Sequence, residues 1–310
     1  LTMNLGDIPV AEALKGLDNV TPKYDTQKQV FQQILTYLEQ ANTEMGSLKT
    51  TNYVLASDFY YGNDLSKWQK AVNAFKLRVL IQLSNKEADT DLAIKTKFAE
   101  TISNPTKYPV FASDADNLAF VYNSQYNKYS TNPDNFGFDA TRYNMSSTYL
   151  GNLTTLKDPR TFFVAEPAAA LVTAGKAPNS YDAFMGAGSG EDLAIMSANA
   201  NLGKYSFINR KRYYQTYTAE TTTQVGYQEM CFNMAEAAHR GWITGQSAET
   251  WYQNGIKASQ AFYGVKEGAN TVTFQKPNGT LAESVTYSVD YKYADYYAQS
   301  TVKYAGSGTT

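Results

Sequence analysis

Two pairs of amphipathic segments constrain the fold of this chain more than any other feature. The first pair lies near residues 26–45 and 66–83, and the second lies near residues 227–241 and 247–264. In each segment, apolar side chains recur at intervals of three and four residues, which places them on one face of a helix. Because every such face must be buried, the sequence predicts a mostly α fold built from packed helix pairs.

The first pair carries start signals for its helices. Thr26 and Gln29 form a possible capping box, as do Ser66 and Gln69. The first helix is expected to end near residues 45–46. The apolar stripe of the first helix is Val30, Ile34, Leu38 and Ala41. That of the second is Trp68, Val72, Phe75, Val79 and Leu83, broadened by Ala71, Leu77 and Ile81.

The second pair predicts a helical hairpin. Its first helix should stop at Gly241, and its second should open at Ser247, so only a short link joins them. The first stripe is Tyr227, Met230, Cys231, Met234, Ala237 and Ala238. In the second helix, the small residues Gly255 and Ala258 stand beside Trp251 and Phe262, a mixture that resembles the packing of tetratricopeptide pairs. The expected fold is therefore a set of irregular tetratricopeptide-like helix pairs.

The helical core is expected at about residues 26–104 and 226–264, with a weaker helix at 89–102 before Pro105. Residues 109–224 lack helical periodicity and are rich in Tyr, Asn, Ser and Gly. A loop-rich stretch of that length is usually functional, so this region is expected to face a ligand. A small β-hairpin is predicted around the turn Pro277-Asn278-Gly279. Its apolar positions are Val272, Phe274, Val285, Tyr287 and Val289.

Aromatic side chains mark the candidate site. The chain has 25 Tyr, 15 Phe and 3 Trp residues, and many of the tyrosines lie in polar stretches where a core would not need them. Sugar rings stack their C–H groups on aromatic faces and hydrogen-bond to planar amides. The candidate ligand-binding residues form two clusters, Tyr122, Tyr126, Tyr129, Asn132, Asn135 and Phe136, and Arg212, Tyr213, Tyr214 and Tyr217. The alternative is that these residues serve ordinary loop packing or contact with a partner protein.

Charge and reactive residues exclude several classes of function. The net charge of −2, without a basic cluster, argues against a nucleic-acid partner. His239 and Cys231 are the only residues of their types and lie eight positions apart on one predicted helix, about 12 Å along its axis, which is too far for a nucleophile and its base. We therefore predict no catalytic residue, no cofactor and no metal site.

Two short motifs can also be interpreted as ion-binding or phosphate-binding sites. Asp114 to Asn117 has calcium-like oxygen spacing, but neither the glycine nor the distal glutamate of a calcium loop completes it. Gly186 to Gly190 resembles a phosphate-binding loop but has no Lys-Ser/Thr after it. The second motif is therefore expected to be a flexible surface loop.

A series of short sequence blocks runs along the chain. One extends from Tyr60 to Trp68 and continues through residues 75–79 to Leu83 and Ser84. The others are residues 6–9, 12–14, 22–25, 158–160, 235–242 and 295–298, with Val302 and Tyr304. In their ordered combination, these blocks resemble the SusD/RagB-like family of outer-membrane nutrient-binding lipoproteins. The resemblance covers nearly the whole chain and identifies it as one SusD-like domain, 1–310, that is expected to be truncated at both ends.

The resemblance implies a function. SusD-like proteins use tetratricopeptide-like helix pairs to support a loop-rich ligand face. By that resemblance the protein would be a surface-exposed lipoprotein of the outer membrane, held there by a lipid anchor outside this chain. It would capture glycans without catalysis and deliver them to a TonB-dependent, SusC-like transporter. The alternative is a structural lid of the transporter that binds peptides or no small ligand itself.

Overall fold

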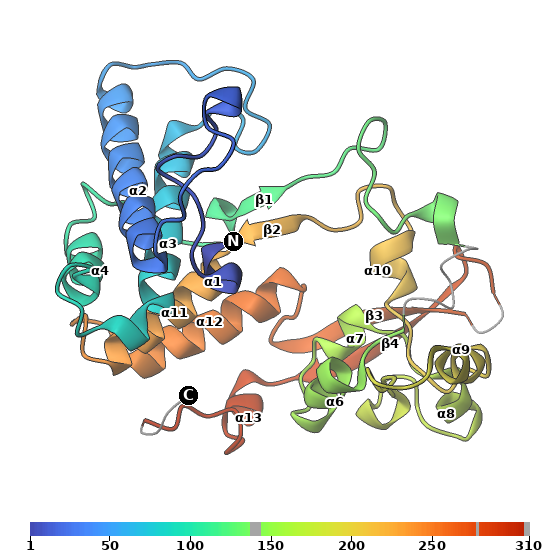
Figure 1. Ribbon diagram of the computed structural model, residues 1–310. Coiled ribbons are helices and arrows are strands. Elements are labelled where there is room, and N and C mark those ends of the chain that lie inside the picture. The colour runs from blue at the N-terminus through green and yellow to red at the C-terminus, as the bar shows by residue number, and fades with distance from the viewer. Residues whose placement is uncertain (137–143, 277–278, 307–310) are drawn as a thin grey trace. The chain divides into compact units, whose positions relative to one another are not determined.

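The computed structural model describes residues 1–136, 144–276 and 279–306 (Figure 1). The chain divides into two compact units. The first comprises Leu1–Leu118 and Gln224–Gly255, and the second comprises Ala119–Thr223 and Ile256–Thr310. The mostly α fold and the small β-hairpin predicted from the sequence are confirmed. Among the described residues, no helix is both long enough and apolar enough to cross a membrane.

The first unit is built around one central helix. It contains α1 (Thr2–Leu5), α2 (Gln27–Thr50), α3 (Leu65–Gln82), α4 (Ile94–Ser103), α11 (Tyr227–His239) and the start of α12 (Ala248–Phe262). Leu77 and Leu80 of α3 are completely buried, and the apolar core gathers around them. In Figure 1, α2 runs beside α3. A short sheet pairs β1 (Leu118–Phe120) with β2 (Thr222–Val225).

The capping box of α2 is confirmed, but other details of the first helix pair differ. Thr26 Oγ1 accepts from Gln29 N at 3.3 Å, and Gln29 Oε1 accepts from Thr26 N at 2.9 Å. The helix continues through Gly46 to Thr50, because packing against α3 outweighs the roughly 1 kcal/mol that a glycine costs within a helix. Asp64 caps α3, so the predicted box at Ser66 is wrong.

The buried face of α3 is also wider than the predicted stripe. Phe75, which the stripe placed in the core, is 36% exposed. Ala74 and Leu80, outside the stripe, are buried. Because α3 packs against α2, α4 and α11, it buries more than one face, and a single stripe cannot describe it.

The helical hairpin α11–α12 is confirmed. Gly241 adopts a left-handed φ of 69° just after α11, and Trp242 N donates to Ala237 O at 2.9 Å, as in a Schellman ending. Ser247 Oγ accepts from Thr250 N at 3.1 Å and opens α12. Gly255 lies against the Phe232 ring, where a Cβ atom would approach within 2.9 Å. The small residue of α12 therefore receives an aromatic ring of α11.

The second unit contains more helix than the sequence indicates. Its helices are α6 (Ser147–Thr155), α7 (Thr161–Val164), α8 (Ala169–Thr173), α9 (Leu193–Asn201), α10 (Arg210–Tyr214), α13 (Tyr293–Tyr297) and the end of α12. Most are only one or two turns long, which is too short to show a helical period, so the loop-rich stretch predicted at 109–224 carries short helices that the sequence pattern did not indicate.

The predicted hairpin pairs β3 (Gly268–Gln275) with β4 (Ser284–Tyr291), antiparallel. Val272 lies opposite Tyr287, and Phe274 lies opposite Val285. Val272 and Phe274 are buried in the core of the second unit together with Leu150, Phe162 and other apolar residues. Pro277 and Asn278 of the predicted turn lie outside the described residues.

Candidate functional site

The two predicted aromatic clusters lie side by side in the second unit. Tyr129 N donates to Tyr217 O at 2.8 Å, and Thr131 Oγ1 donates to Tyr213 O at 3.0 Å. Tyr217 Oη donates to Asp134 Oδ1 at 2.7 Å. The segments 122–136 and 210–217 therefore form one surface, although about 80 residues separate them in the chain.

We call Tyr122, Tyr126, Tyr129, Tyr213 and Tyr217 the aromatic surface. The rings of Tyr122 and Tyr129 meet edge to face, with centroids 5.0 Å apart. Tyr126 is 89% exposed, so both faces of its ring are accessible. The ammonium group of Lys128 lies 4.3 Å from the Tyr217 ring centre, which holds that ring in place.

The two asparagines of the first cluster build the loop itself. Asn132 is buried, its Oδ1 accepts from Asp134 N at 3.0 Å, and its Nδ2 donates to Tyr129 O at 2.8 Å. Asn135 Oδ1 accepts from Asn132 N at 2.9 Å, and its Nδ2 donates to Ser130 O at 2.6 Å. Both amides close a 3₁₀ turn at Pro133–Asn135, so their polar atoms are committed to the backbone that carries the tyrosines.

Three further predicted residues support the surface from behind. Tyr214 is completely buried, and its ring packs edge to face on Phe136 at 5.3 Å. Arg212 Nε donates to Glu220 Oε2 at 2.5 Å, and its Nη1 donates to Tyr263 O at 3.0 Å. These contacts fix the position of α10 next to the aromatic surface.

A cavity of about 510 Å³ lies in the same unit and shares Phe136 with the first cluster. We call it the Arg210 cavity. Its apolar and aromatic lining is Phe136, Pro167, Ala169, Val172, Pro178, Phe207, Phe274, Val285 and Tyr287. Its polar lining is Glu166, Thr173, Arg210, Gln275 and Lys276, with Gly279 at one edge. A few polar groups within apolar walls are typical of small-molecule sites.

The buried carboxylate of Glu166 ties two elements of this cavity together. Its Oε1 accepts from Arg210 N at 2.7 Å, at the start of α10, and its Oε2 accepts from Gln275 N at 3.0 Å, in β3. Burial raises the pKa of Glu166 to about 7 despite these two hydrogen bonds. Sequence reasoning missed Glu166 and Arg210 because nothing local marks them: Glu166 meets its partners only across 44 and 109 residues of chain.

The raised pKa predicts a pH dependence of stability. The folded state holds the Glu166 proton up to about pH 7, whereas the unfolded state releases it near pH 4.5. The contribution of Glu166 to the free energy of unfolding is therefore fully present below pH 4.5. It decreases by about 3 kcal/mol in total as the pH rises to about 7. Denaturant unfolding between pH 4.5 and 8 should show this loss in the wild type.

The Glu166→Gln variant cannot ionise at this position and should show a flatter pH profile. Glu87→Gln, which replaces an exposed glutamate of the first unit, is the matched control and should keep the wild-type slope. A Glu166→Gln profile parallel to the wild type would contradict the assignment.

Comparisons with known proteins decide the family. The sequence model SusD-like_2, described as "Starch-binding associating with outer membrane", matches residues 1–304. The chain belongs to the SusD-like family. A search of the curated proteins gave no match.

Solved structures of SusD homologues share the fold. One from Bacteroides fragilis has a TM-score of 0.80 and 29% identity, over 99% of this chain and 61% of its own. A second from the same species has a TM-score of 0.70 and 31% identity, over 83% and 53%. A chitin-binding SusD homologue from Flavobacterium johnsoniae is similar in fold, with a TM-score of 0.65 and 21% identity over 88% and 53%. The chain thus spans about half to three fifths of these SusD-like proteins.

The SusD-like block at residues 60–68 has a packing role in this structure. Trp68 Nε1 donates to Asp58 Oδ2 at 2.9 Å, and the rings of Tyr60 and Tyr61 meet Trp68 edge to face. Trp242 is buried against Phe98. The buried Trp242 therefore offers no open ring face to a sugar, whereas Trp68 is half-buried and lines a pocket of about 320 Å³.

In the calcium-like motif, the side-chain oxygen atoms of Asp116 and Asn117 already have protein partners. Asp116 Oδ1 pairs with Lys70 Nζ at 2.9 Å, and its Oδ2 accepts from Ala112 N at 2.8 Å. Asn117 Oδ1 accepts from Tyr227 N at 2.7 Å.

Cys231, the one thiol, is completely buried, and burial raises its pKa to about 11, so it is not a nucleophile at neutral pH.

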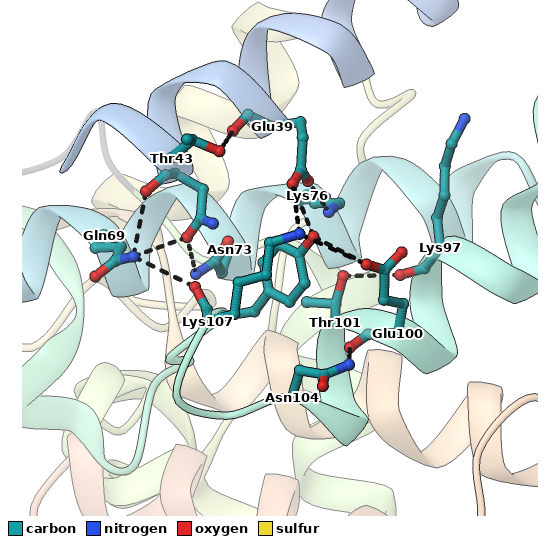
Figure 2. Close-up of polar contacts among 12 residues, drawn as sticks. Glu39, Thr43, Gln69, Asn73, Lys76, Lys97, Glu100, Thr101, Asn104 and Lys107 are labelled. Carbon is teal, nitrogen blue, oxygen red and sulfur yellow. Dashed lines mark hydrogen bonds and ion pairs between the residues drawn. The ribbon is translucent and has the colours of Figure 1, made fainter. Parts of the chain in front are cut away.

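A polar groove of about 640 Å³ in the first unit is a second candidate, and its polar contacts are drawn in Figure 2. Lys76, only 3% exposed, donates to Glu39 Oε2 at 2.7 Å. Tyr108 Oη donates to Glu39 Oε1 at 2.7 Å, and its ring lies 4.3 Å from the Lys76 ammonium group. The buried ammonium group of Lys76 is thus paired with Glu39 and covered by the Tyr108 ring. This network holds α2, α3 and the segment after α4 together.

Proposed function

We propose that this SusD-like protein captures a glycan without altering it and delivers it to a TonB-dependent, SusC-like transporter as a surface-exposed lipoprotein of the outer membrane. The observation that carries the proposal is the convergence of the two tyrosine-bearing segments on one surface. The family description, which names starch binding and the outer membrane, supports it.

The geometry favours binding over catalysis. Stacking on Tyr126 and its neighbours, with hydrogen bonds from the tyrosine hydroxyls, suits a sugar that must later be released. Micromolar to millimolar affinity, roughly 4 to 8 kcal/mol, would permit transfer to the transporter.

Titration calorimetry against a panel of glycans tests the proposal. The panel contains malto-oligosaccharides, chito-oligosaccharides, and neutral and acidic plant oligosaccharides. Replacing the exposed ring in Tyr126→Ala should weaken binding of the active glycan about tenfold, since one stacking contact contributes about 1.4 kcal/mol. Tyr24→Ala removes a ring that is also exposed, at 72%, but lies in the first unit. This control should bind as the wild type does, and a panel without any binding heat would refute glycan capture.

The alternative is a structural lid of the transporter that binds peptides or no small ligand itself. The hydrogen bonds of Asn132 and Asn135 within their own loop favour it, because one N–H and the oxygen of each amide are already used there. Co-purification with the transporter, together with full uptake by cells carrying Tyr126→Ala and Tyr213→Ala, would support the lid.

A further inference from the structure

An ion pair lies beside the aromatic surface. Arg212 Nε donates to Glu220 Oε2 at 2.5 Å, and Arg212 Nη2 lies 2.5 Å from the same oxygen. The third nitrogen, Nη1, donates to Tyr263 O at 3.0 Å. The side chains of the pair are only 19% and 20% exposed. Every nitrogen of the guanidinium thus has an acceptor, and its charge is compensated within the protein.

The carboxylate of Glu220 is used on one side only. Both contacts with Arg212 involve Oε2, and Oε1 accepts no hydrogen bond from the residues that the structure describes. This second oxygen is not sealed from solvent. An ionised carboxylate can only accept hydrogen bonds, so Oε1 is suited to a ligand group that donates one.

Tyrosine side chains surround this ion pair. The Cζ atom of Arg212 lies 5.0 Å from the ring centre of Tyr263 and 5.9 Å from that of Tyr213. Burial raises the pKa of Tyr129, and the negative charge of Glu220 raises it further. Burial also raises the pKa of Tyr213, and Glu220 again adds to the rise. The open carboxylate oxygen is therefore close to the hydroxyl ends of two tyrosines of the aromatic surface.

A charged acceptor next to aromatic rings suits a sugar hydroxyl group. The sugar ring stacks on a tyrosine, and a hydroxyl group donates to the carboxylate in a bond that is stronger than one between neutral groups. Because the guanidinium of Arg212 is already paired, the group that faces a ligand at this point is the carboxylate, which repels an anion. The arrangement therefore favours a neutral sugar over an acidic one.

We propose that Glu220 Oε1 accepts a hydrogen bond from a hydroxyl group of the glycan and thereby selects neutral sugars over uronic acids. The inference rests on the proposed function and adds the class of glycan and a specificity-determining residue. Glu220 was not among the candidates taken from the sequence, because a single glutamate in a polar stretch carries no local signal. Its place beside the tyrosines depends on the fold.

Titration calorimetry with matched sugars tests the proposal. Each neutral oligosaccharide of the panel that binds is compared with an acidic counterpart of the same backbone. The counterpart is made by oxidising C6 hydroxyl groups to carboxylates or, for pentoses, by adding a glucuronic acid side chain. We expect the acidic form to bind the wild type about tenfold more weakly than the neutral form. Glu220→Gln keeps the size of the side chain and removes its charge, so this preference should disappear.

A second variant separates recognition from support. Arg212→Met leaves Glu220 as an unpaired carboxylate, so the preference for the neutral form should rise above the wild-type value. If Glu220 served only to hold α10 in place, both variants would weaken the neutral and the acidic form by the same factor and leave the preference unchanged.

The control variant is Glu191→Gln. Glu191 Oε1 accepts from Tyr205 Oη at 2.8 Å and from Asn199 Nδ2 at 3.0 Å, so this carboxylate also pairs with a tyrosine hydroxyl, but not with one of the aromatic surface. The variant should keep the wild-type preference.

The outcomes separate this inference from the proposed function. Equal affinity of the wild type for the two forms, binding of acidic members of the panel only, or an unchanged preference in Glu220→Gln would overturn the role of Glu220. Each of these results would leave glycan capture standing. No binding by any glycan would refute both.

Discussion

Replacing Asp158 with alanine should destabilise the protein by about 3 to 5 kcal/mol, measured by denaturant unfolding at pH 7. Asp158 is completely buried, and its Oδ2 accepts from Arg160 Nη2 at 2.6 Å and from Tyr296 Oη at 2.8 Å. Its Oδ1 accepts from Arg160 Nε at 3.0 Å. Without the carboxylate, the largely buried guanidinium loses its counter-ion and keeps only the neutral Ser259 Oγ as an acceptor, and the buried hydroxyl of Tyr296 loses its acceptor.

The size of this effect follows from desolvation. The charge of Arg160 is held in the second unit by Asp158, and the neighbouring carboxylate raises the guanidinium pKa against the effect of burial. The double variant Asp158→Ala, Arg160→Met should recover part of the loss, because it removes the unpaired charge as well. A double variant less stable than Asp158→Ala would contradict the argument.

A matched ion pair in the same unit provides the control. Lys176 Nζ lies 3.3 Å from Asp182 Oδ2, and both side chains are about half exposed or more. Water solvates these charges in both the folded and unfolded states, so Asp182→Ala should change stability by about 0.5 kcal/mol or less. A loss as large as that of Asp158→Ala would show that pairing itself, rather than burial, sets the effect.

The sequence predicts the first unit better than the second because its helices are long. The 24 residues of α2 repeat the apolar period several times, and its capping box adds a local signal, so its existence and start could be predicted. The four residues of α7 and the five of α8 show no period. Their helical geometry depends on tertiary packing, which sequence patterns do not record.

The candidate site, too, could be predicted from the sequence only in part. The tyrosines could be selected from the sequence because their setting among polar residues is a local property. The sequence could not show that the amide of Asn132 hydrogen-bonds within its own loop or that the ring of Tyr214 is buried. Both properties depend on contacts that form only in the folded chain. The partnership of Glu166 with Gln275 joins residues 109 positions apart and leaves no local signal.

At Gly186, too, a local sequence motif predicts the wrong structure. The motif Gly186 to Gly190 was expected to be a flexible surface loop, but this is wrong at its first residues. Ala187 is buried, its N–H donates to Met145 O at 2.8 Å, and its carbonyl accepts from Ser147 N at 2.7 Å. The glycine is required here by the approach of another backbone segment.

Replacing Gly186 with alanine should therefore destabilise the second unit by about 3 kcal/mol or more, lowering its melting temperature by roughly 5 to 10 °C. A Cβ atom at Gly186 would lie 2.5 Å from the carbonyl group of Ser146 and the amide nitrogen of Ser147. These atoms cannot move easily, because Ser146 caps α6, where its Oγ accepts from Tyr149 N at 3.2 Å. Moving the cap would in turn displace Leu150 from the core.

The same motif supplies the control for this prediction. Gly190 is exposed, adopts no left-handed backbone conformation, and has no heavy atom within 4 Å of a Cβ position. Gly190→Ala should melt within about 2 °C of the wild type, because an added methyl group there meets only solvent. Since both substitutions reduce the freedom of the unfolded chain alike, the difference between them isolates the steric cost at Gly186. Equal melting temperatures for the two variants would mean that residues 145–147 yield to the new side chain, and the close backbone approach would then not be what requires a glycine at this position.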